Sequence, residues 1–573
     1  MCGIIGITRN RSASVKSSLI SALERLEYRG YDSCGFATSA GKIEKSTGKI
    51  NSFRFPNIQF KTAISHTRWA THGGVTTTNS HPHFNNDKTI FVVHNGIIEN
   101  FIEMRSRLET QGCNFISDTD SEIIPHYLDC KLSQGKTMPQ AIRDFFNEAQ
   151  GTFAALIIRK DQNKIYALKK DSPLVLGLCK NSFTIASDIY AFSNRTNKAI
   201  FFDDYEYAVI EPDSYTFYNR EGAQIQKPVT EFQWSREEQT KESYPHYMIK
   251  EIREQPETSQ RLIQSINTTQ KDKIQQLASL IKQSKRIVFV ACGTSYHASL
   301  VGAQLMQRYP VHAIIASEFD TFYHVNPETL VIAISQSGET MDVVRVVKEA
   351  KARGASAASL TNVPYSTLQR ISDISLEILA GQEICVAATK SFTNQVILLL
   401  ALAKELGIEL DLEQIPLNIA HTIEKNEPIA KETASKLKDR NDIFILGKGP
   451  SYPVSREIAL KLKEIPYMHA EGMMAGELKH GTIALIEQDT PVISLIPNNN
   501  KDMISSTKEV EARGAKTIII SNTNGDFHLP ASKDADFAIY ASIIGHLLSY
   551  YIAVLRGCEI DKPRNLAKSV TVN

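Results

Sequence analysis

The stretch RIVFVACGTSY at residues 286–296 is a continuous apolar run that ends in a glycine, two hydroxyls and the start of a helical pattern. The stretch DIFILGKGPSY at residues 442–452 repeats this arrangement. A second similar pair, KEAKARGA at 348–355 and KEVEARGA at 508–515, lies at nearly the same separation along the chain. Two matches at one spacing indicate a duplicated domain, and buried apolar strands that alternate with helices predict an α/β doubly wound parallel sheet in each copy.

The two copies differ in the loop that follows their second strand. The strand Leu330–Ile334 leads into SQSGET at 335–340, whereas the second copy has Pro497–Lys501, which lacks the hydroxyls. Hydroxyls, a glycine and the free N–H groups of a helix start can hold a phosphate without a lysine, although an ordinary serine-rich turn has the same composition. Because ligands of such sheets bind where strand carboxyl ends meet helix N-termini, we predict one phosphate site, near Gly293-Thr294-Ser295 in the first copy.

The amino-terminal half begins Met1-Cys2-Gly3, followed by the short apolar strand Ile4–Ile7. If Met1 is removed, Cys2 carries both a thiol and a free α-amine that titrates near neutrality, so the amine can act as the general base for its own thiol. The alternative is that this start has no catalytic meaning. Short strands interleaved with helical segments predict an α+β layered domain for residues 1–225.

Polar clusters in this half supply the other groups that acyl transfer from an amino acid needs. The side-chain amide of Asn95 and the N–H of Gly96 can form an oxyanion hole, although Asn-Gly after a strand is usually a tight turn. Arg68 and Asp120 are candidates for the carboxylate and ammonium of an amino-acid substrate, although Asp120 could simply cap a helix. The histidines at 66, 72, 81, 83 and 94 lack the paired spacing of metal ligands, so we expect no metal.

Composition excludes several classes of function. With 573 residues, 42% hydrophobic and 22% charged, the chain is expected to be globular with two to four domains. A net charge of +1 provides no strong electrostatic attraction to nucleic acid or to a membrane surface. The chain shows no signal-peptide pattern, and its eight cysteines form no C-x-x-C pair, which indicates reduced thiols in the cytoplasm. The apolar runs Val396–Ala403 and Ile543–Leu555 are predicted to be buried helices.

The motifs predict five segments. We expect His246–Pro256 to be a short helix whose charged face is solvated. The expected segments are a first domain at 1–225, a linker at 226–245, the two copies at 246–425 and 426–560, and a tail at 561–573.

The combined motifs resemble a known family. Met1–Ile4, Glu27–Ser33, Thr67–Gly73 and His94–Asn100 are similar to the class II glutamine amidotransferase domain, which has an N-terminal-nucleophile fold. The duplicated half resembles two sugar isomerase (SIS) domains, and 335–340 matches their phosphate loop. Together with the tail 563–572, these motifs resemble the isomerising glutamine–fructose-6-phosphate aminotransferases over nearly the whole chain.

The resemblance implies a role for each matching residue. Cys2 attacks the glutamine side-chain amide, Asn95 and Gly96 hold the oxyanion, and Trp69 gates the path of ammonia. Lys568 forms a Schiff base, Glu464 moves a proton between C1 and C2 with Lys461 assisting, and His480 of the partner subunit opens the sugar ring. Glutamine is bound by Arg68, Thr71, His72 and Asp120, and the sugar phosphate by Thr294, Ser295, Ser335, Gln336, Ser337 and Thr340, with backbone contacts from Val386 and Ala567.

The sequence departs from the family at a few positions. Cys34 replaces the more usual alanine, which should change packing only. Ala388 replaces a serine, which removes one expected hydrogen bond to the sugar. The region 48–61 is shorter than in typical members, and no long insertion of the kind linked to feedback by nucleotide sugars is present.

The resemblance also predicts the reaction and the assembly. Glutamine and fructose 6-phosphate give glucosamine 6-phosphate and glutamate, with ammonia passing internally, no cofactor, and a cytoplasmic homodimer. Alternatives are an amidotransferase or deaminase for another sugar phosphate, or a sugar-phosphate sensor without activity. A Lys461–Glu464 pair could also be an ordinary surface ion pair, and a lysine near the C-terminus is usually solvated.

Overall fold

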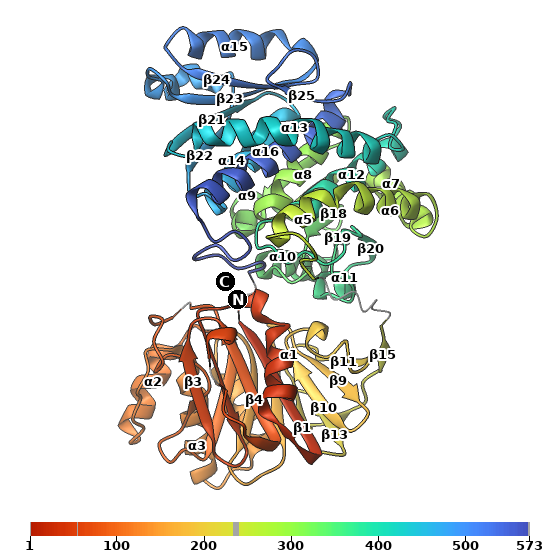
Figure 1. Cartoon of the computed structure of the whole chain (residues 1–573). Helices are drawn as coiled ribbons and strands as arrows, with labels where there is room; N and C mark the ends of the chain where they lie inside the picture. The colour runs from red at the N-terminus through yellow and green to blue at the C-terminus, as the bar shows by residue number, and fades with distance from the viewer. Residues whose placement is uncertain (1, 54, 71, 233–239, 571–573) are drawn as a thin grey trace. The chain divides into compact units, whose positions relative to one another are not determined.

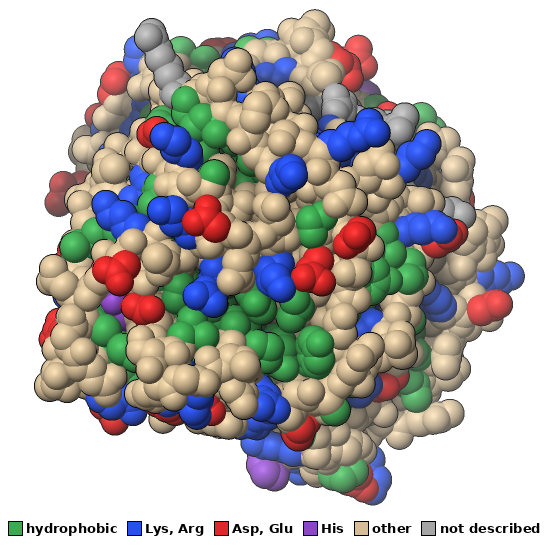
Figure 2. Space-filling view, turned by 90° about the horizontal axis from the view of Figure 1, so that it is seen from below, with side chains coloured by type: hydrophobic (Ala, Val, Ile, Leu, Met, Phe, Trp, Pro, Cys, Tyr) green, Lys and Arg blue, Asp and Glu red, His purple; other side chains and the backbone are tan. Residues whose placement is uncertain are grey.

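The computed structural model describes residues 2–53, 55–70, 72–232 and 240–570, which form two compact units (Figure 1). The first unit contains residues 2–232 with Ser569 and Val570, and the second contains residues 240–568. The first runs from red to yellow in Figure 1, and the second is mostly green to blue. The face shown in Figure 2 carries basic and acidic side chains interspersed, in keeping with the net charge of +1.

The first unit is built on two antiparallel sheets. One has the order β15-β11-β9-β10-β1-β4-β2-β3 and the other the order β14-β13-β12-β8-β7-β6-β5. The first sheet consists of β1 (Gly3–Ser14), β2 (Ser33–Thr38), β3 (Ile43–Thr47), β4 (Gln59–Arg68), β9 (Val175–Cys179), β10 (Ser182–Ala186), β11 (Lys198–Phe201) and β15 (Thr230–Glu231). The second consists of β5 (His83–Phe84), β6 (Ile90–Ile98), β7 (Gly151–Arg159), β8 (Ile165–Lys170), β12 (Glu206–Ile210), β13 (Tyr215–Tyr218) and β14 (Gln224–Ile225).

Alternating apolar side chains on the second sheet form two separate cores. In β6, Phe91 and Val93 pack with Ile4 and Ile64 of the first sheet, whereas Val92 faces the helices on the other side. This follows from the period of two along a strand, which sends successive side chains to opposite faces. The result is the predicted α+β layered domain. Its helices are α1 (Ser21–Glu24), which follows a π-helix at Val15–Ile20, then α2 (Phe101–Thr110), α3 (Ile123–Ser133) and α4 (Met138–Glu148).

The second unit contains two parallel sheets with the same topology, which confirms the predicted duplication. Their orders are β17-β16-β18-β19-β20 and β22-β21-β23-β24-β25. The first sheet consists of β16 (Arg286–Ala291), β17 (Val311–Ile315), β18 (Thr329–Ser335), β19 (Ser356–Thr361) and β20 (Ile374–Glu377). The second consists of β21 (Asp442–Gly447), β22 (His469–Met474), β23 (Pro491–Ile496), β24 (Lys516–Ser521) and β25 (Phe527–His528).

Helices connect and cover these parallel strands, and one hydrophobic core runs through both copies. The expected boundary at 425/426 lies inside α13, and the expected linker at 226–245 includes β15, which pairs with β11. The helices are α5 (Tyr247–Arg253), α6 (Gln255–Asn267), α7 (Lys271–Gln283), α8 (Gly293–Leu305), α9 (Phe319–Phe322), α10 (Met341–Ala352), α11 (Thr367–Ile371), α12 (Lys390–Glu405), α13 (Ile415–Leu437), α14 (Ser451–Glu464), α15 (Lys501–Glu511) and α16 (Asp534–Arg556).

Two helices test expectations about burial. Helix α16 is long and apolar enough to cross a membrane, but 83% of its most apolar window is buried inside the protein, as predicted for a core helix. The prediction that the charged face of the helix at 246–256 is solvated holds for Arg253, which is exposed, but is wrong for two other charged residues. Lys250 and Glu251 of α5 are both buried, because Lys250 pairs with Glu242 and Glu251 accepts hydrogen bonds from the backbone of a loop.

Candidate functional site

Cys2 lies immediately before β1 in the first unit. Its Sγ accepts a hydrogen bond from the N–H of Trp69 at 3.3 Å, and burial raises the pKa of its thiol. Strand β1 pairs with β4 from Gly3–Thr67 onward, so the end of β4 brings Trp69 next to the cysteine. A thiol with a raised pKa is a poor nucleophile unless a base takes its proton.

Asn95 and Gly96 lie inside β6 rather than in a turn, so the tight-turn alternative is wrong. Asn95 donates from Nδ2 to the carbonyl oxygen of Cys2 at 2.8 Å, and its Oδ1 lies 3.1 Å from Nε2 of His66. Gly96 has φ +125°, and a Cβ there would come within 2.0 Å of the carbonyl oxygen of Thr152. The position therefore requires glycine, and the amide of Asn95 is fixed beside the cysteine.

The described residues that are expected to bind glutamine lie in the same unit as Cys2. Arg68 at the end of β4 donates to the carbonyl oxygens of His72 at 2.5 Å and Gly73 at 3.1 Å, which shapes the loop after β4. Asp120 is buried at the start of a 3₁₀ turn and accepts from the N–H of Ile98 in β6 at 2.8 Å. Thr71 lies outside the described residues.

Four of the histidines form a buried cluster. The rings of His66 and His81 stack with centroids 4.0 Å apart, and His83 and His94 are buried nearby. Burial lowers the pKa of all four, that of His66 to about 3, so they are neutral at physiological pH. No group of three or more His, Cys, Asp or Glu side chains among the described residues is arranged to hold a metal ion.

In the second unit, the hydroxyl loop lies between β18 and α10. Ser335 Oγ accepts from the N–H of Gly338 at 3.0 Å and contacts Thr340 Oγ1 at 3.0 Å. Gly338 has φ +65°, and a Cβ there would meet Ser366 Oγ at 2.1 Å. Gln336 accepts from Asn362 N and Val363 N through its backbone oxygen. The loop is thus a tight turn whose hydroxyls and helix N–H groups gather at the end of a strand.

Thr294 and Ser295 lie at the neighbouring strand end, in the first turn of α8 after β16. Strands β16 and β18 are adjacent, and their connections leave in opposite directions, toward β17 and β19. This is the switch point at which doubly wound sheets bind ligands. The structure therefore places both groups of expected phosphate ligands at the carboxyl ends of two adjacent strands of one sheet.

Helix α14 of the second copy places charged side chains next to Thr294 of the first copy. Lys461 Nζ lies 2.6 Å from Glu464 Oε2, 3.3 Å from Glu457 Oε1 and 3.1 Å from Thr294 Oγ1. The Lys461 side chain is 1% exposed, so the surface-ion-pair alternative is wrong. Burial opposes the charge of Glu457, but Lys461 and His297 outweigh it and lower the pKa of Glu457 to about 2.

Lys568 is buried rather than solvated. Its side chain is 3% exposed and its Nζ lies 2.5 Å from Oε2 of Glu383, which is fully buried. Burial alone would raise the pKa of Glu383, but the charge and hydrogen bond of Lys568 bring that pKa well below its usual range. Val386, three residues after Glu383, donates its N–H to the carbonyl oxygen of Asp561, so the loop and the tail are held together.

Helix α12 connects the partner of Lys568 to Ser295 of α8. Ser391 donates to Glu383 Oε2 at 2.7 Å, and Gln395 donates to Ser295 Oγ at 2.9 Å. These two residues are one helical turn apart, which is about 6 Å along the axis. A continuous set of contacts therefore runs from Lys568 through α12 to Ser295, and from the adjacent Thr294 to Lys461 and Glu464.

One expected residue lies apart from this set. His480 ends a 3₁₀ turn at Glu477–His480 and is exposed, and its side chain makes no hydrogen bond or ion pair with the described part of the chain. Ala388 and Ala567 are both half-buried in the loop and the tail that flank Lys568.

The site also contains carboxylates that sequence reasoning missed. Glu383 sits in a loop without regular structure, so no local pattern marks it. Glu457 precedes Lys461 by four residues on α14, and this spacing could have indicated a pair on one helix face.

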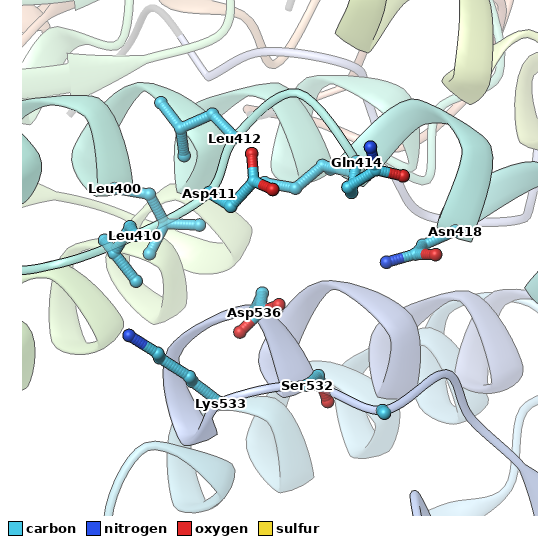
Figure 3. Close-up of a pocket in the computed structure, with 11 residues that line it drawn as sticks. Leu400, Leu410, Asp411, Leu412, Gln414, Asn418, Ser532, Lys533 and Asp536 are labelled. Atoms are coloured by element: carbon cyan, nitrogen blue, oxygen red, sulfur yellow. The ribbon is translucent and has the colours of Figure 1, made fainter.

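A cavity of about 330 Å³ lies elsewhere in the second unit (Figure 3). Asp536 at the start of α16 and Asn418 of α13 point toward it, and Leu400, Leu410 and Leu412 form an apolar wall. None of the residues expected to bind either substrate lines this cavity.

Comparison with known proteins agrees with this division. The glutamine amidotransferase domain family matches residues 66–194, and the SIS domain family matches residues 280–405 and 436–547. A solved C-terminal domain of glucosamine-fructose-6-phosphate aminotransferase from Francisella tularensis is 33% identical, with a TM-score of 0.52, and covers 57% of this chain and 100% of its own. A solved glucosamine-6-phosphate deaminase from Thermotoga maritima is 25% identical, with a TM-score of 0.50 and the same coverage.

Fold and site thus define a two-part protein that joins a glutamine amidotransferase domain to a pair of SIS domains. Relatives match this chain over its whole length. Proteins named glutamine--fructose-6-phosphate aminotransferase [isomerizing] from Thermococcus kodakarensis and Chlorobaculum tepidum are 41% and 40% identical, each with 100% of both chains covered. The chain belongs to the family of isomerising glutamine–fructose-6-phosphate aminotransferases.

Proposed function

We propose that this chain converts glutamine and fructose 6-phosphate to glutamate and glucosamine 6-phosphate. The observation that carries the proposal is the connected set of side chains in the second unit. A buried lysine is held by a buried carboxylate and is linked through one turn of α12 to a hydroxyl-rich crevice at a sheet switch point. A sugar-phosphate sensor needs the crevice but has no use for the buried lysine.

The first unit releases ammonia from glutamine. Once Met1 is removed, the α-amine of Cys2 takes the proton of its own thiol, whose pKa is raised by burial, and the thiolate attacks the side-chain amide. Asn95 Nδ2, now 2.8 Å from the carbonyl oxygen of Cys2, and the N–H of Gly96 stabilise the oxyanion. Arg68 and Asp120 bind the carboxylate and ammonium of glutamine, His72 and Thr71 complete that site, and Trp69 controls the exit of ammonia.

The second unit places that ammonia on the sugar. The phosphate binds to Ser335, Gln336, Ser337 and Thr340 at the N-terminus of α10, with Thr294 and Ser295 from α8. Lys568, held 2.5 Å from Glu383 Oε2, gives up a proton to water and captures the C2 carbonyl as a Schiff base, with loss of a water molecule. Ammonia then displaces the lysine amine from C2, which frees Lys568 and leaves an imine on the sugar. Glu464, oriented by Lys461, then moves a proton between C1 and C2.

We also propose a cytoplasmic homodimer with ammonia passing internally between the two units. His480 is exposed in its own chain, and Met474 and Leu485 on either side of it are large apolar side chains that are 48% and 62% exposed. An interface over this surface would cover both and would let His480 of the partner subunit open the sugar ring.

Two substitutions test whether the halves of the reaction are separable. Lys568→Ala should abolish synthesis of glucosamine 6-phosphate but leave glutamine hydrolysis, since it removes only the Schiff base. Cys2→Ala should abolish the use of glutamine but leave the binding of fructose 6-phosphate. Loss of glutamine hydrolysis in Lys568→Ala, or loss of fructose 6-phosphate binding in Cys2→Ala, with the fold intact by circular dichroism, would contradict two separate sites.

The runner-up is a deaminase or amidotransferase for another sugar phosphate, favoured only by the fold shared with the Thermotoga maritima deaminase. A panel of hexose and pentose ketose phosphates, each assayed with glutamine and with ammonia, separates these activities. Higher kcat/KM for any other member of the panel than for fructose 6-phosphate would favour the runner-up.

A further inference from the structure

Glu251 of α5 is a buried carboxylate to which the reaction as described assigns no part. Its side chain has no exposed surface, although it lies on a short helix rich in charged residues. Burying a carboxylate is costly unless its oxygens gain partners. Such a residue in the interior of an enzyme therefore calls for a specific role, and its contacts indicate one.

One oxygen of Glu251 holds the backbone beside the reactive lysine. Its Oε1 accepts hydrogen bonds from Ile384 N at 2.5 Å and Cys385 N at 3.2 Å. These two amides lie between Glu383, which pairs with Lys568, and Val386, which is expected to contact the sugar. A carboxylate that binds both intervening amides fixes the direction of the residues on either side.

The other oxygen, Oε2, is buried and has no hydrogen-bond partner within the described residues. An unpartnered buried oxygen would ordinarily be selected against, because it loses its hydration without compensation. A proton on Glu251 removes the charge from this oxygen and so lowers the cost, and burial raises the pKa of this carboxyl to about 8.

The charges that face Glu251 come from three other segments. Lys390 of α12 and Lys568 of the tail lower its pKa, whereas Glu383 of the loop raises it. Lys390 is itself paired with Glu254 at 2.7 Å, and Lys250 on α5 is paired with Glu242. A protonated Glu251 leaves the two buried lysines balanced by Glu383 and Glu254, whereas an ionised Glu251 adds one negative charge beside Lys568.

We propose that Glu251 is a positioning residue of the sugar site, which holds the 384–385 backbone so that Glu383 keeps Lys568 at the carbonyl of the bound ketose phosphate. This inference rests on the proposed function. Glu251 itself does not touch the sugar. Its ionisation, by adding a negative charge near Lys568, favours the protonated lysine and so opposes Schiff-base formation.

The test compares Glu251→Ala, Glu251→Gln and the surface control Glu257→Gln, whose parent side chain is 80% exposed on α6. The readouts are kcat and KM for fructose 6-phosphate, glutamine hydrolysis without sugar, and borohydride trapping of the imine at Lys568 measured by peptide mass. Alanine removes both backbone contacts, so we expect kcat/KM and trapping to fall by about 100-fold, the effect of a misplaced reactive group. Glutamine hydrolysis and the control should be unchanged.

Glutamine at 251 keeps an acceptor oxygen but cannot ionise. We therefore expect Glu251→Gln to restore kcat/KM and trapping to within about threefold of wild type near pH 7, and to exceed wild type above about pH 8, where Glu251 ionises. A purely structural role would leave the two pH profiles parallel.

The outcomes separate this inference from the function on which it rests. If the wild-type protein itself traps no fructose 6-phosphate at Lys568, the proposed function fails. If wild type traps the sugar and folded Glu251→Ala traps it equally well, the positioning role is overturned. Parallel pH profiles of wild type and Glu251→Gln would overturn it too. This comparison does not use the alanine variant, so it decides the question even if Glu251→Ala does not fold.

Discussion

The two parallel sheets of the second unit share one strand order but carry different groups at the same place. At the switch point of the first sheet, Ser335 and Thr340 form a hydroxyl cradle at the start of α10. At the matching place in the second sheet, Asn498 and Asn499 adopt positive φ. The backbone N–H of Asn498 donates to Asn522 Oδ1, and Asn499 Oδ1 accepts from the hydroxyl of Thr523. The polar groups of the second loop bond to the loop after β24, whereas the hydroxyls of the first bond within their own loop at a helix N-terminus.

The two copies therefore carry different groups on the same fold. The second copy has no hydroxyl cradle of its own, but its helix α14 carries Glu457, Lys461 and Glu464 to Thr294 of the first copy. Under the proposed function, one copy binds the phosphate and the other supplies the groups for proton transfer. The common fold fixes where a ligand binds, and a few side chains decide which copy does the binding and which does the chemistry.

The largest effect is expected when the proton-transferring carboxylate of the second copy is removed and the first copy is left unchanged. Glu464→Gln keeps the size of the side chain but cannot carry the proton, so kcat should fall by about 10³-fold. The Kd for fructose 6-phosphate, measured by calorimetry, should change by less than about twofold. A large loss of sugar binding would show that the second copy also binds substrate.

The reverse experiment removes the cradle of the first copy. The double variant Ser335→Ala and Thr340→Ala deletes two hydroxyls expected to bind the phosphate. The loss of about one to three kcal/mol of binding free energy should raise KM for fructose 6-phosphate by about 10–100-fold. The matched double variant Asn499→Ala and Asn500→Ala in the second copy should leave KM unchanged. Equal effects in both loops would contradict a single phosphate site.

A smaller effect, on the free energy of unfolding, is expected when a glycine with positive φ is replaced by alanine in a loop of each copy. Gly338→Ala puts a Cβ 2.1 Å from Ser366 Oγ at φ +65°, and should lower the free energy of unfolding by about 2–3 kcal/mol. Gly449→Ala, in the first loop of the second copy, also has positive φ (+57°) but has nothing within 4 Å, and should cost about 1 kcal/mol. Urea unfolding of both variants measures the difference, and equal costs would mean that the turn at Gly338 is not as tight as described.

The smallest expected effect concerns the ion pair that occupies the second switch point. Lys448 pairs with Asp502 while both side chains are at least half exposed. Exposed pairs of this kind contribute little, so Lys448→Ala should leave both the free energy of unfolding and kcat/KM nearly unchanged. Loss of activity would place Lys448 in a second ligand site.

Much of this division could be predicted from the sequence, because it depends on local patterns. Apolar runs ending in glycine and hydroxyls predicted the parallel strands and the crevice, and SQSGET predicted which copy carries the cradle. Asn95 shows where local patterns fail. Asn-Gly favours a turn, but pairing of β6 with β7 and the close approach of Thr152 keep both residues within a strand.

The rest depends on contacts between distant segments. Glu383, Glu251 and Lys568 come from a loop, α5 and the C-terminal tail, and no periodicity connects them. The face of α5 was expected to be solvated because its charges fit an exposed helix equally well. Only the packing of α5 against the 384–385 backbone shows that Glu251 is buried.

The most direct test of the central claim is an end-point assay of the purified protein with glutamine and fructose 6-phosphate. Glutamate and glucosamine 6-phosphate are quantified in the same sample. The account predicts that the two products accumulate in equal amounts, because ammonia made at Cys2 is transferred to the sugar held by Lys568. Glutamate without amino sugar would contradict it, and would leave the second unit without its proposed reaction.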